Sequence, residues 1–188
     1  GRQVRYAYDL ADRLTEAMAG DASYENRNTY TYDEVGNLIS TTDGNGNKMT
    51  YTYDLLSNQT SRTNALGETE SYSYNLNNRL EKITRPNGNT IQYDYNKLDA
   101  LLQTDYSEEA DGQVLYTYDE EGKRLSMSDL TGTSTYQYDA DGRITGVQQG
   151  DGSVILYNYD SYGNLAKLIY PDGSEVPVSY THLTLPTT

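Results

Sequence analysis

The chain of 188 residues contains no cysteine, phenylalanine or tryptophan, and it has only four prolines and one histidine. The absence of cysteine excludes a disulfide framework and thiolate chemistry together. The only histidine, His182, lies in the last few residues, so no nucleophile–base pair of the triad type is expected. The sequence therefore predicts a protein that is not an enzyme, without cofactor or metal. A hydrolase with two carboxylates is the remote alternative that this acidic composition leaves open.

Basic residues are also scarce. The chain has 14 lysines and arginines against 28 aspartates and glutamates, which gives a formal net charge of −14. Phosphate binding needs clustered cations, so this balance argues against nucleic acid as a partner and against an anionic membrane surface. No apolar run reaches the roughly 20 residues that a bilayer-spanning helix requires. The chain is therefore expected not to span a membrane, and to attract basic partners.

What is abundant is tyrosine. All 21 aromatic residues are tyrosines, and sixteen of them form eight Tyr-x-Tyr pairs. Each pair is followed by Asp or Asn, and the steps from one second tyrosine to the next are 24, 21, 21, 21, 23, 20 and 21 residues. A fixed period of this size is typical of arrays in which each unit buries its apolar face against its neighbours. This regular patterning favours a folded array over disorder, although hydrophobic residues make up only 35% of the chain.

Each period predicts a β-hairpin. In the segment from Tyr136 to Ser153, an alternating strand is followed by a turn at residues 139–142, a returning strand and a second turn at residues 149–152. The recurring Asp is interpreted as a backbone cap of the turn and the recurring Gly as the residue with positive φ. In three copies Asp12, Ser57 and Asn78 replace that Gly. Extra residues at 21–28 and 107–110 are placed in turns, where insertions cost little.

The alternation also predicts the two faces of the sheet. The tyrosines share one face with aliphatic residues that come two positions before them, and mostly polar residues lie between the tyrosines on the other face. The returning strands should supply aliphatic rows that alternate with the tyrosine rows. These rows consist of Leu14, Leu38, Leu80, Leu125, Ile144 and Leu165. The tyrosines are thereby predicted to be a packing layer, with a sugar-binding platform as the alternative.

One segment superficially matches a calcium loop. Asp43, Asn45, Asn47 and Asp54 fall at its positions 1, 3, 5 and 12. The sixth position is Lys48, where such a loop needs Gly, and position 12 lacks the bidentate Glu. These residues are therefore interpreted as solvated turn residues.

The motif Tyr-x-Tyr-Asp-x-x-Gly-Arg/Asn-Leu resembles the YD-repeat family, also called Rhs repeats. Clear copies are residues 30–38 and 136–144. The resemblance implies an all-β fold of tandem hairpins of about 21 residues, which form one long, curved antiparallel sheet as part of a shell. The motif residues are Tyr30, Tyr32, Asp33, Gly36, Tyr51, Tyr53, Asp54, Tyr72, Tyr74, Tyr93, Tyr95, Tyr116, Tyr118, Asp119, Gly122, Tyr136, Tyr138, Asp139, Gly142, Tyr157, Tyr159, Asp160 and Gly163.

The resemblance also implies a function. Residues 1–180 are expected to be eight repeats and part of a ninth that starts near Val176. Residues 181–188 depart from the motif and are expected to be a non-native tail, with a genuine C-terminal strand as the alternative. The chain is interpreted as a fragment of the shell wall of an Rhs, wall-associated or teneurin-like protein that is secreted or lies at the cell surface. Its expected partners are the rest of that shell and an enclosed C-terminal effector domain. The alternative is an adhesion module whose tyrosine rows bind carbohydrate, such as a cell-surface glycan, or a protein.

Overall fold

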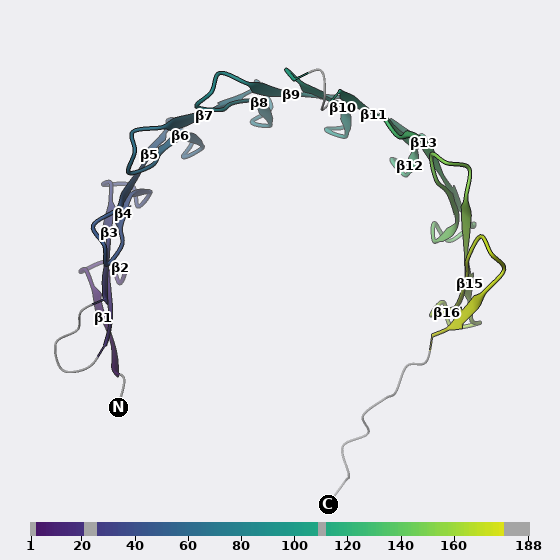
Figure 1. Cartoon of the computed structure of the whole chain (residues 1–188), viewed down its shortest axis with the longest axis horizontal. Coiled ribbons are helices and arrows are strands. Elements are labelled where there is room, and N and C mark those ends of the chain that lie inside the picture. Colours follow the sequence, from purple (N-terminus) through teal and green to yellow (C-terminus); the bar gives the residue numbers. More distant parts are fainter. Residues whose placement is uncertain (1–2, 21–25, 109–111, 179–188) are drawn as a thin grey trace, which may run out of the picture. The chain divides into compact units, whose positions relative to one another are not determined.

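A computed structural model describes residues 3–20, 26–108 and 112–178 of the chain. All regular elements in these ranges are β-strands, which confirms the predicted all-β hairpin fold (Figure 1). The strands are β1 (Gln3–Tyr8), β2 (Leu14–Gly20), β3 (Asn26–Tyr32), β4 (Leu38–Thr42), β5 (Lys48–Tyr53), β6 (Gln59–Thr63), β7 (Thr69–Tyr74), β8 (Leu80–Thr84), β9 (Thr90–Tyr95), β10 (Leu101–Tyr106), β11 (Gln113–Tyr118), β12 (Arg124–Asp129), β13 (Gly132–Tyr138), β14 (Ile144–Gln148), β15 (Val154–Tyr159), β16 (Leu165–Ile169) and β17 (Glu175–Pro177). No helix suited to crossing a bilayer occurs in the described ranges.

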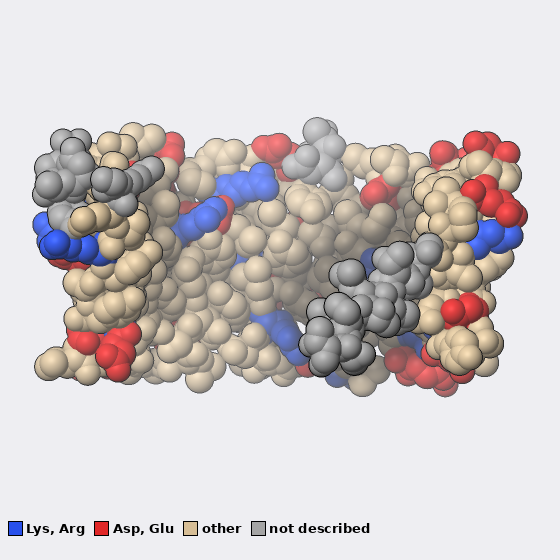
Figure 2. All heavy atoms as spheres, turned by 90° about the horizontal axis from the view of Figure 1, so that it is seen from below, with Lys and Arg blue, Asp and Glu red and all other residues tan. Residues whose placement is uncertain are grey.

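The chain forms two compact units, residues 1–92 and residues 93–188, and β9 begins in the first and ends in the second. Within each unit, consecutive strands pair antiparallel to make a meander of hairpins. In Figure 2, most acidic side chains in view lie near the upper and lower borders, and several Lys and Arg side chains lie between them.

The turns share one backbone pattern. At residues 54–58, for example, the amide of Ser57 donates to the carbonyl of Asp54 and the amide of Asp54 donates to the carbonyl of Asn58. This pattern is a turn closed by a residue with positive φ, which connects two strands through three residues. Asp12, Ser57 and Asn78 have φ of 58°, 64° and 63°, so the predicted replacements of Gly adopt the same conformation. Asp99, with φ of 61°, is a further replacement that the sequence analysis did not identify.

The hairpin of β12 and β13 is an exception among the described turns. Asp129 pairs directly with Gly132, so only Leu130 and Thr131 connect the strands. This turn is one residue shorter, which explains the 20-residue step from Tyr118 to Tyr138. Its backbone lies close to the next turn on the same edge, because a Cβ on Gly132 would stand 2.7 Å from the carbonyl oxygen of Gly150.

A β-bulge recurs beside the second tyrosine in seven of the eight hairpins in the described ranges. In β5 and β6, Thr52 pairs with Ser61 and Tyr53 pairs with Gln59, so Thr60 is an extra residue. The ladders β1–β2, β3–β4, β7–β8, β11–β12, β13–β14 and β15–β16 have their register shift at the equivalent place. A bulge bends its strand and increases the local twist. Repetition of the bulge in these hairpins therefore accounts for the bend of the sheet within each unit (Figure 1).

The face assignment is confirmed in outline and wrong at one position. Antiparallel pairing aligns Tyr72 with Ile83 and Ile83 with Ile91, which is the expected row of an aromatic and two aliphatic residues. Leu125, however, is the bulge residue of β12 and is 42% exposed. Arg124 takes its place opposite Tyr118. The prediction failed there because Leu125 stands six residues after Asp119, whereas Leu38 stands five after Asp33, so Leu125 falls at the bulge position instead of opposite the tyrosine.

The sheet is a single layer with very little fully buried surface. Among the described residues, only Ile91, Ser40, Thr104 and Gly146 are buried. The tyrosines of the inner strands are half-buried, whereas Tyr6 and Tyr8 in β1 are both 59% exposed. Burial of each tyrosine pair therefore depends on the neighbouring hairpins, as the fixed period indicates.

Two expectations about chain segments have different outcomes. The extra residues at 21–28 are only partly in a turn, because Asn26–Asn28 pair with β2 and belong to β3. Residues 21–25, and residues 109–110 of the second extra segment, lie outside the described ranges. A ninth repeat strand does begin, as β17, near Val176. Tyr180 and the expected tail at 181–188 lie outside the described residues.

Candidate functional site

The motif residues take two kinds of position. The tyrosine pairs close the odd-numbered strands β3, β5, β7, β9, β11, β13 and β15, while the Asp and Gly residues form the turns that follow them. Positive φ at Gly36, Gly122, Gly142 and Gly163 confirms the role assigned to glycine.

The second tyrosine of a pair fastens its repeat to the preceding one. The hydroxyl of Tyr53 in β5 donates to the backbone carbonyl of Leu38 in β4, with 2.9 Å between the oxygens. The equivalent bonds, at 2.8 to 2.9 Å, run from Tyr32 to Leu14, Tyr74 to Gln59, Tyr118 to Leu101, Tyr138 to Arg124 and Tyr159 to Ile144. We call this contact the tyrosine latch.

The latch replaces ladder hydrogen bonds where neighbouring strands diverge. The ladder between β4 and β5 joins only Ser40–Thr42 with Lys48–Thr50. Leu38 lies beyond its end, and its carbonyl accepts the tyrosine hydroxyl instead. Because a carbonyl without a partner costs free energy when shielded from water, the tyrosine stabilises a sheet whose bulges draw its strands apart. The sequence predicted that these rings pack within the sheet, but it did not predict which groups accept their hydroxyl hydrogen bonds. Every residue has a backbone carbonyl, so no residue type marks the acceptor.

The Asp at each turn accepts a cluster of hydrogen bonds. In Asp54, Oδ1 accepts from the amides of Leu56 and Asn58 at 2.8 and 2.9 Å, and Oδ2 accepts from Nδ2 of Asn58 at 2.9 Å. These bonds lower the pKa of the Asp54 carboxyl, the side-chain bond from Asn58 most and its backbone bond next. The backbone and side-chain bonds from Asn164 likewise lower the pKa of Asp160. The Asn or Arg that follows the motif glycine is therefore part of the cap.

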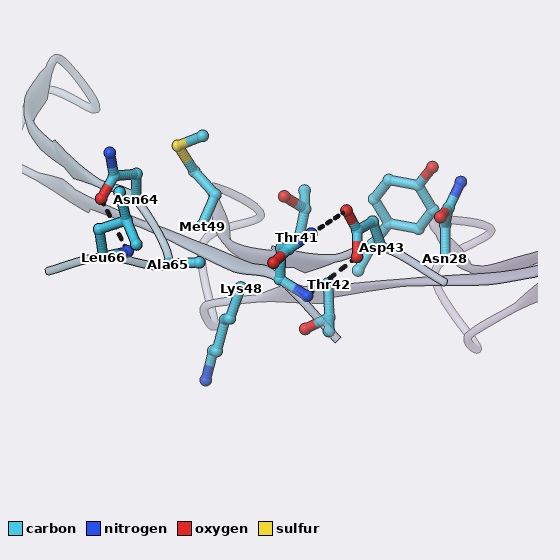
Figure 3. A pocket seen from close by; sticks show the side chains of 11 residues that line it. Asn28, Thr41, Thr42, Asp43, Lys48, Met49, Asn64, Ala65 and Leu66 are labelled. Atoms are coloured by element: carbon cyan, nitrogen blue, oxygen red, sulfur yellow. Dashed lines mark hydrogen bonds between the residues drawn. The ribbon is translucent and has the colours of Figure 1, made fainter. Parts of the chain in front are cut away.

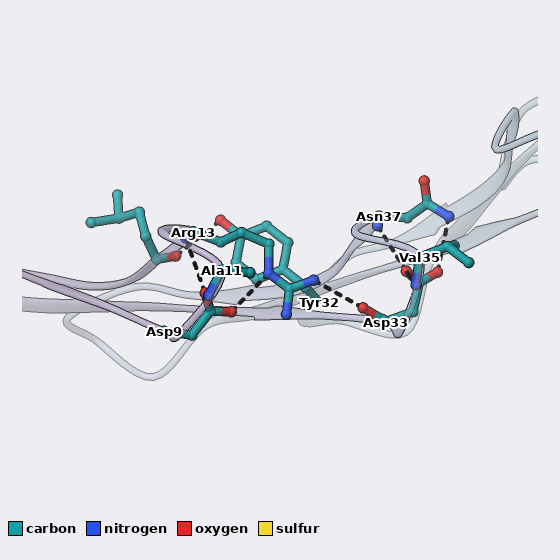
Figure 4. A network of polar contacts seen from close by, with 8 residues as sticks. Asp9, Ala11, Arg13, Tyr32, Asp33, Val35 and Asn37 are labelled. Carbon is teal, nitrogen blue, oxygen red and sulfur yellow. Dashed lines mark hydrogen bonds and ion pairs between the residues drawn. The ribbon is translucent and has the colours of Figure 1, made fainter.

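Where that residue is Arg, it also connects two turns (Figure 4). Within its own turn, Nε of Arg13 forms an ion pair with Oδ2 of Asp9 at 2.7 Å. Nη1 of Arg13 also donates to the carbonyl of Asp33, in the turn that follows the next tyrosine pair, at 3.0 Å. Its guanidinium lies over the Tyr32 ring, 4.9 Å from the ring centre. Arg143 stacks on Tyr159 in the same way, at 5.0 Å. A basic residue at this position therefore reinforces the latch of the following repeat.

One row of the tyrosine face is charged. Tyr51 aligns with Arg62 and Arg62 with Glu70, and Arg62 Nε lies 3.1 Å from Glu70 Oε1. The hydroxyl of Tyr72 donates to the same carboxylate. Burial and this hydrogen bond raise the pKa of Tyr72 to about 12. Tyr72 therefore remains a hydrogen-bond donor up to strongly alkaline pH.

A hollow of the first unit lies beside the Tyr30 ring, on the tyrosine face and the adjacent turns (Figure 3). Its volume is about 470 Å³, and its lining includes Tyr30, Met49 and Leu66 with polar groups such as Asn28. In Figure 3, Met49 and Lys48 project to opposite sides of β5, so Met49 supplies the apolar wall. The hollow is open and combines an aromatic ring with amide groups.

The candidate calcium residues are not brought together. Asp43 caps the turn before β5 and Asp54 caps the turn after it, so the length of a six-residue strand, about 20 Å, separates them. Asp43 accepts both the amide and the side-chain nitrogen of Asn47 within its own turn. No cluster of three potential metal ligands occurs in the described ranges.

Tandem hairpins fastened by side chains define a structural class, the β-repeat scaffolds. Within this class, the RHS Repeat family model matches residues 32–69 and 138–175. These two segments match the Rhs repeat that the tyrosine motif indicates.

Solved structures share its fold. The TcdB2–TccC3–Cdc42 complex matches with a TM-score of 0.71 and 16% identity over 87% of this chain. TcdB2–TccC3 without its hypervariable C-terminal region gives 0.70 and 17% over 86%, and the Photorhabdus luminescens Tc holotoxin pore gives 0.69 and 16% over 87%. The chain spans 11% of the length of each of these chains. No curated protein matches the chain.

Proposed function

We propose that this chain is wall material of an encapsulating β-shell in a large secreted or cell-surface protein of the toxin-delivery type. The proposal rests on one observation: the motif residues make the contacts that join one hairpin to the next. The tyrosine latch, the Asp caps and the Arg contacts all satisfy groups of the array itself. A single-layer sheet built this way can be extended by adding further hairpins.

The fold shared with chains of Tc toxin complexes supports the same proposal. Under it, the partners are the remaining repeats of the shell and an enclosed C-terminal effector domain. The natural full-length protein that contains residues 1–180 tests it. Electron microscopy is expected to show a hollow particle, and limited proteolysis is expected to leave the enclosed segment uncut until the shell is opened. A solid rod, or an enclosed segment that is cut as fast as a free peptide, would reject the proposal.

A second candidate is carbohydrate binding, which the hollow beside Tyr30 favours. An exposed aromatic face beside amide groups suits a sugar ring, because the ring stacks and the amides bond hydroxyls. The Tyr53 and Tyr74 hydroxyls are used in latches, so this hollow is a better location than the tyrosine rows as a whole. A glycan array tests the candidate with wild type and Asn28→Ala: reproducible binding that the variant loses would support it, and no binding by wild type would reject it.

A further inference from the structure

The turns that follow the tyrosine pairs carry exposed aliphatic side chains in the first unit. Leu10, Leu55 and Leu76 are fully exposed, and Val35 and Leu56 are 79% and 72% exposed. They occupy the two tip positions of four successive turns on one edge of the sheet, after β1, β3, β5 and β7. We call these five residues the leucine edge.

The turn itself does not need these side chains. At residues 54–58 the bonds to Asp54 come from backbone amides, including that of Leu56 at 2.8 Å, so any residue of suitable φ would serve. Equivalent tips in the second unit carry Glu120 and Glu121 after β11 and Ala140 and Asp141 after β13, whereas Leu98 and Tyr162 are exposed tips there, at 75% and 90%. An exposed leucine tip is therefore not a requirement of the repeat, and a row of them marks an interaction surface.

The charge of the edge fits a partner of its own kind. Among the eight tip positions of the four turns, Glu34 is the only charged residue, although 22% of the whole chain is charged. The matching tips of the second unit include the charged residues Lys97, Glu120, Glu121 and Asp141. The eight tip side chains of a leucine edge therefore bring a single carboxylate, Glu34, to a second edge, whereas the turn carboxylates Asp9, Asp33 and Asp54 accept hydrogen bonds within their own turns.

The spacing of the edge supports the same occupant. Each repeat contributes two strands, so successive tips are about 10 Å apart. A second hairpin edge has this period and meets every tip in register, whereas same-face residues of an extended peptide recur every 6.6 to 6.8 Å, roughly. We propose that the leucine edge packs against the leucine edge of a second copy of this array, turn tip to turn tip. This inference rests on the proposed function, because it describes how one stretch of a shell wall meets another.

The absence of native cysteine allows a direct test by crosslinking the whole chain. Leu56→Cys and Asn45→Cys place one thiol each at the same turn position at opposite ends of β5. Under mild oxidation at high protein concentration, Leu56→Cys is expected to form disulfide dimers at least about tenfold faster than Asn45→Cys. Adding Leu10→Ser, Leu55→Ser and Leu76→Ser should abolish that difference, and adding Leu66→Ser on the opposite edge should leave it unchanged.

Far-UV circular dichroism of every variant separates the possible failures. Equal crosslinking at the two positions in folded proteins overturns the inference, as does a rate that the triple variant leaves unchanged. Crosslinking only after a helical or other foreign partner is added also overturns it, because the occupant is then not a second array. None of these results touches the proposed function, which fails instead if the natural full-length protein does not form a hollow particle.

Discussion

At the scale of single residues, the second tyrosine of each pair joins two repeats through its hydroxyl. Phe has the same ring without the donor, so the replacement separates hydrogen bonding from packing. We expect Tyr53→Phe to lower the free energy of unfolding by about 1 kcal/mol, because the bond to the Leu38 carbonyl is lost. Urea denaturation followed by circular dichroism measures the change.

The control for this variant is Tyr8→Phe. Tyr8 has the same place in the motif but lies in β1, where no earlier repeat precedes it among the described residues, and it is 59% exposed. Its replacement is expected to change stability by less than about 0.5 kcal/mol. Equal losses for the two variants would show that the latch has no special role.

Ser57 has a backbone conformation that glycine adopts at lower cost. It adopts φ of 64° at a position where most repeats have Gly, and a residue with a Cβ is strained there. We expect Ser57→Gly to stabilise the protein by about 0.5–1 kcal/mol, and Ser73→Gly within strand β7 to destabilise it by a similar amount. If the urea midpoint falls in both variants, the turn at residues 54–58 is not strained by Ser57.

At the scale of the hairpin, the Asp caps make stability depend on acid. Hydrogen bonds from Asn58 and Asn164 lower the pKa of Asp54 and Asp160 in the folded protein. The unfolded chain then binds protons more readily, so this stabilisation is complete above pH 4, approximately, and is lost as the pH falls through the lower folded pKa. We expect thermal melting points to fall steeply below about pH 4.

The chain itself supplies the matched variant. Asn75 and Asn96 occupy the same turn position, and their Oδ1 atoms accept the same two backbone amides. The combined change of Asp54→Asn and Asp160→Asn should therefore keep both turns folded and reduce the dependence of melting temperature on acid, to which Asp9, Asp33, Asp43, Asp129, Asp139, Asp151 and Asp172 still contribute. An unchanged slope would locate the acid sensitivity elsewhere.

The hairpin is also the scale at which sequence was most informative. Asp and Gly at fixed offsets predict the turn because they determine backbone hydrogen bonds locally, and even Ser57 and Asn78 conform. The bulges could not be predicted, since an extra residue such as Thr60 has no distinctive side chain. For the same reason, the sequence did not predict that Leu125 lies at a bulge, or that backbone carbonyls accept the tyrosine hydroxyls.

At the scale of the whole molecule, stability depends on Tyr53, Tyr72 and Tyr74 remaining protonated. Burial raises the pKa of Tyr53 and Tyr74, both latch residues, and burial with the bond to Glu70 raises that of Tyr72 to about 12. Free tyrosine ionises near pH 10, approximately. The unfolded chain therefore releases these protons first, and the stabilisation present below pH 10 is lost as the pH rises from about 10 towards the folded pKa.

Because an ionised tyrosine cannot donate to a carbonyl, we expect the array to unfold as its tyrosines ionise. Tyrosinate absorbance and far-UV circular dichroism, recorded together during an alkaline titration, should change in one cooperative step above about pH 10. Each latch holds two adjacent repeats, so its loss should weaken both neighbours and sharpen the step. Ionisation of most tyrosines near pH 10 with the sheet signal intact would instead mean that packing of the rings, without their hydroxyl bonds, is sufficient to hold the repeats together.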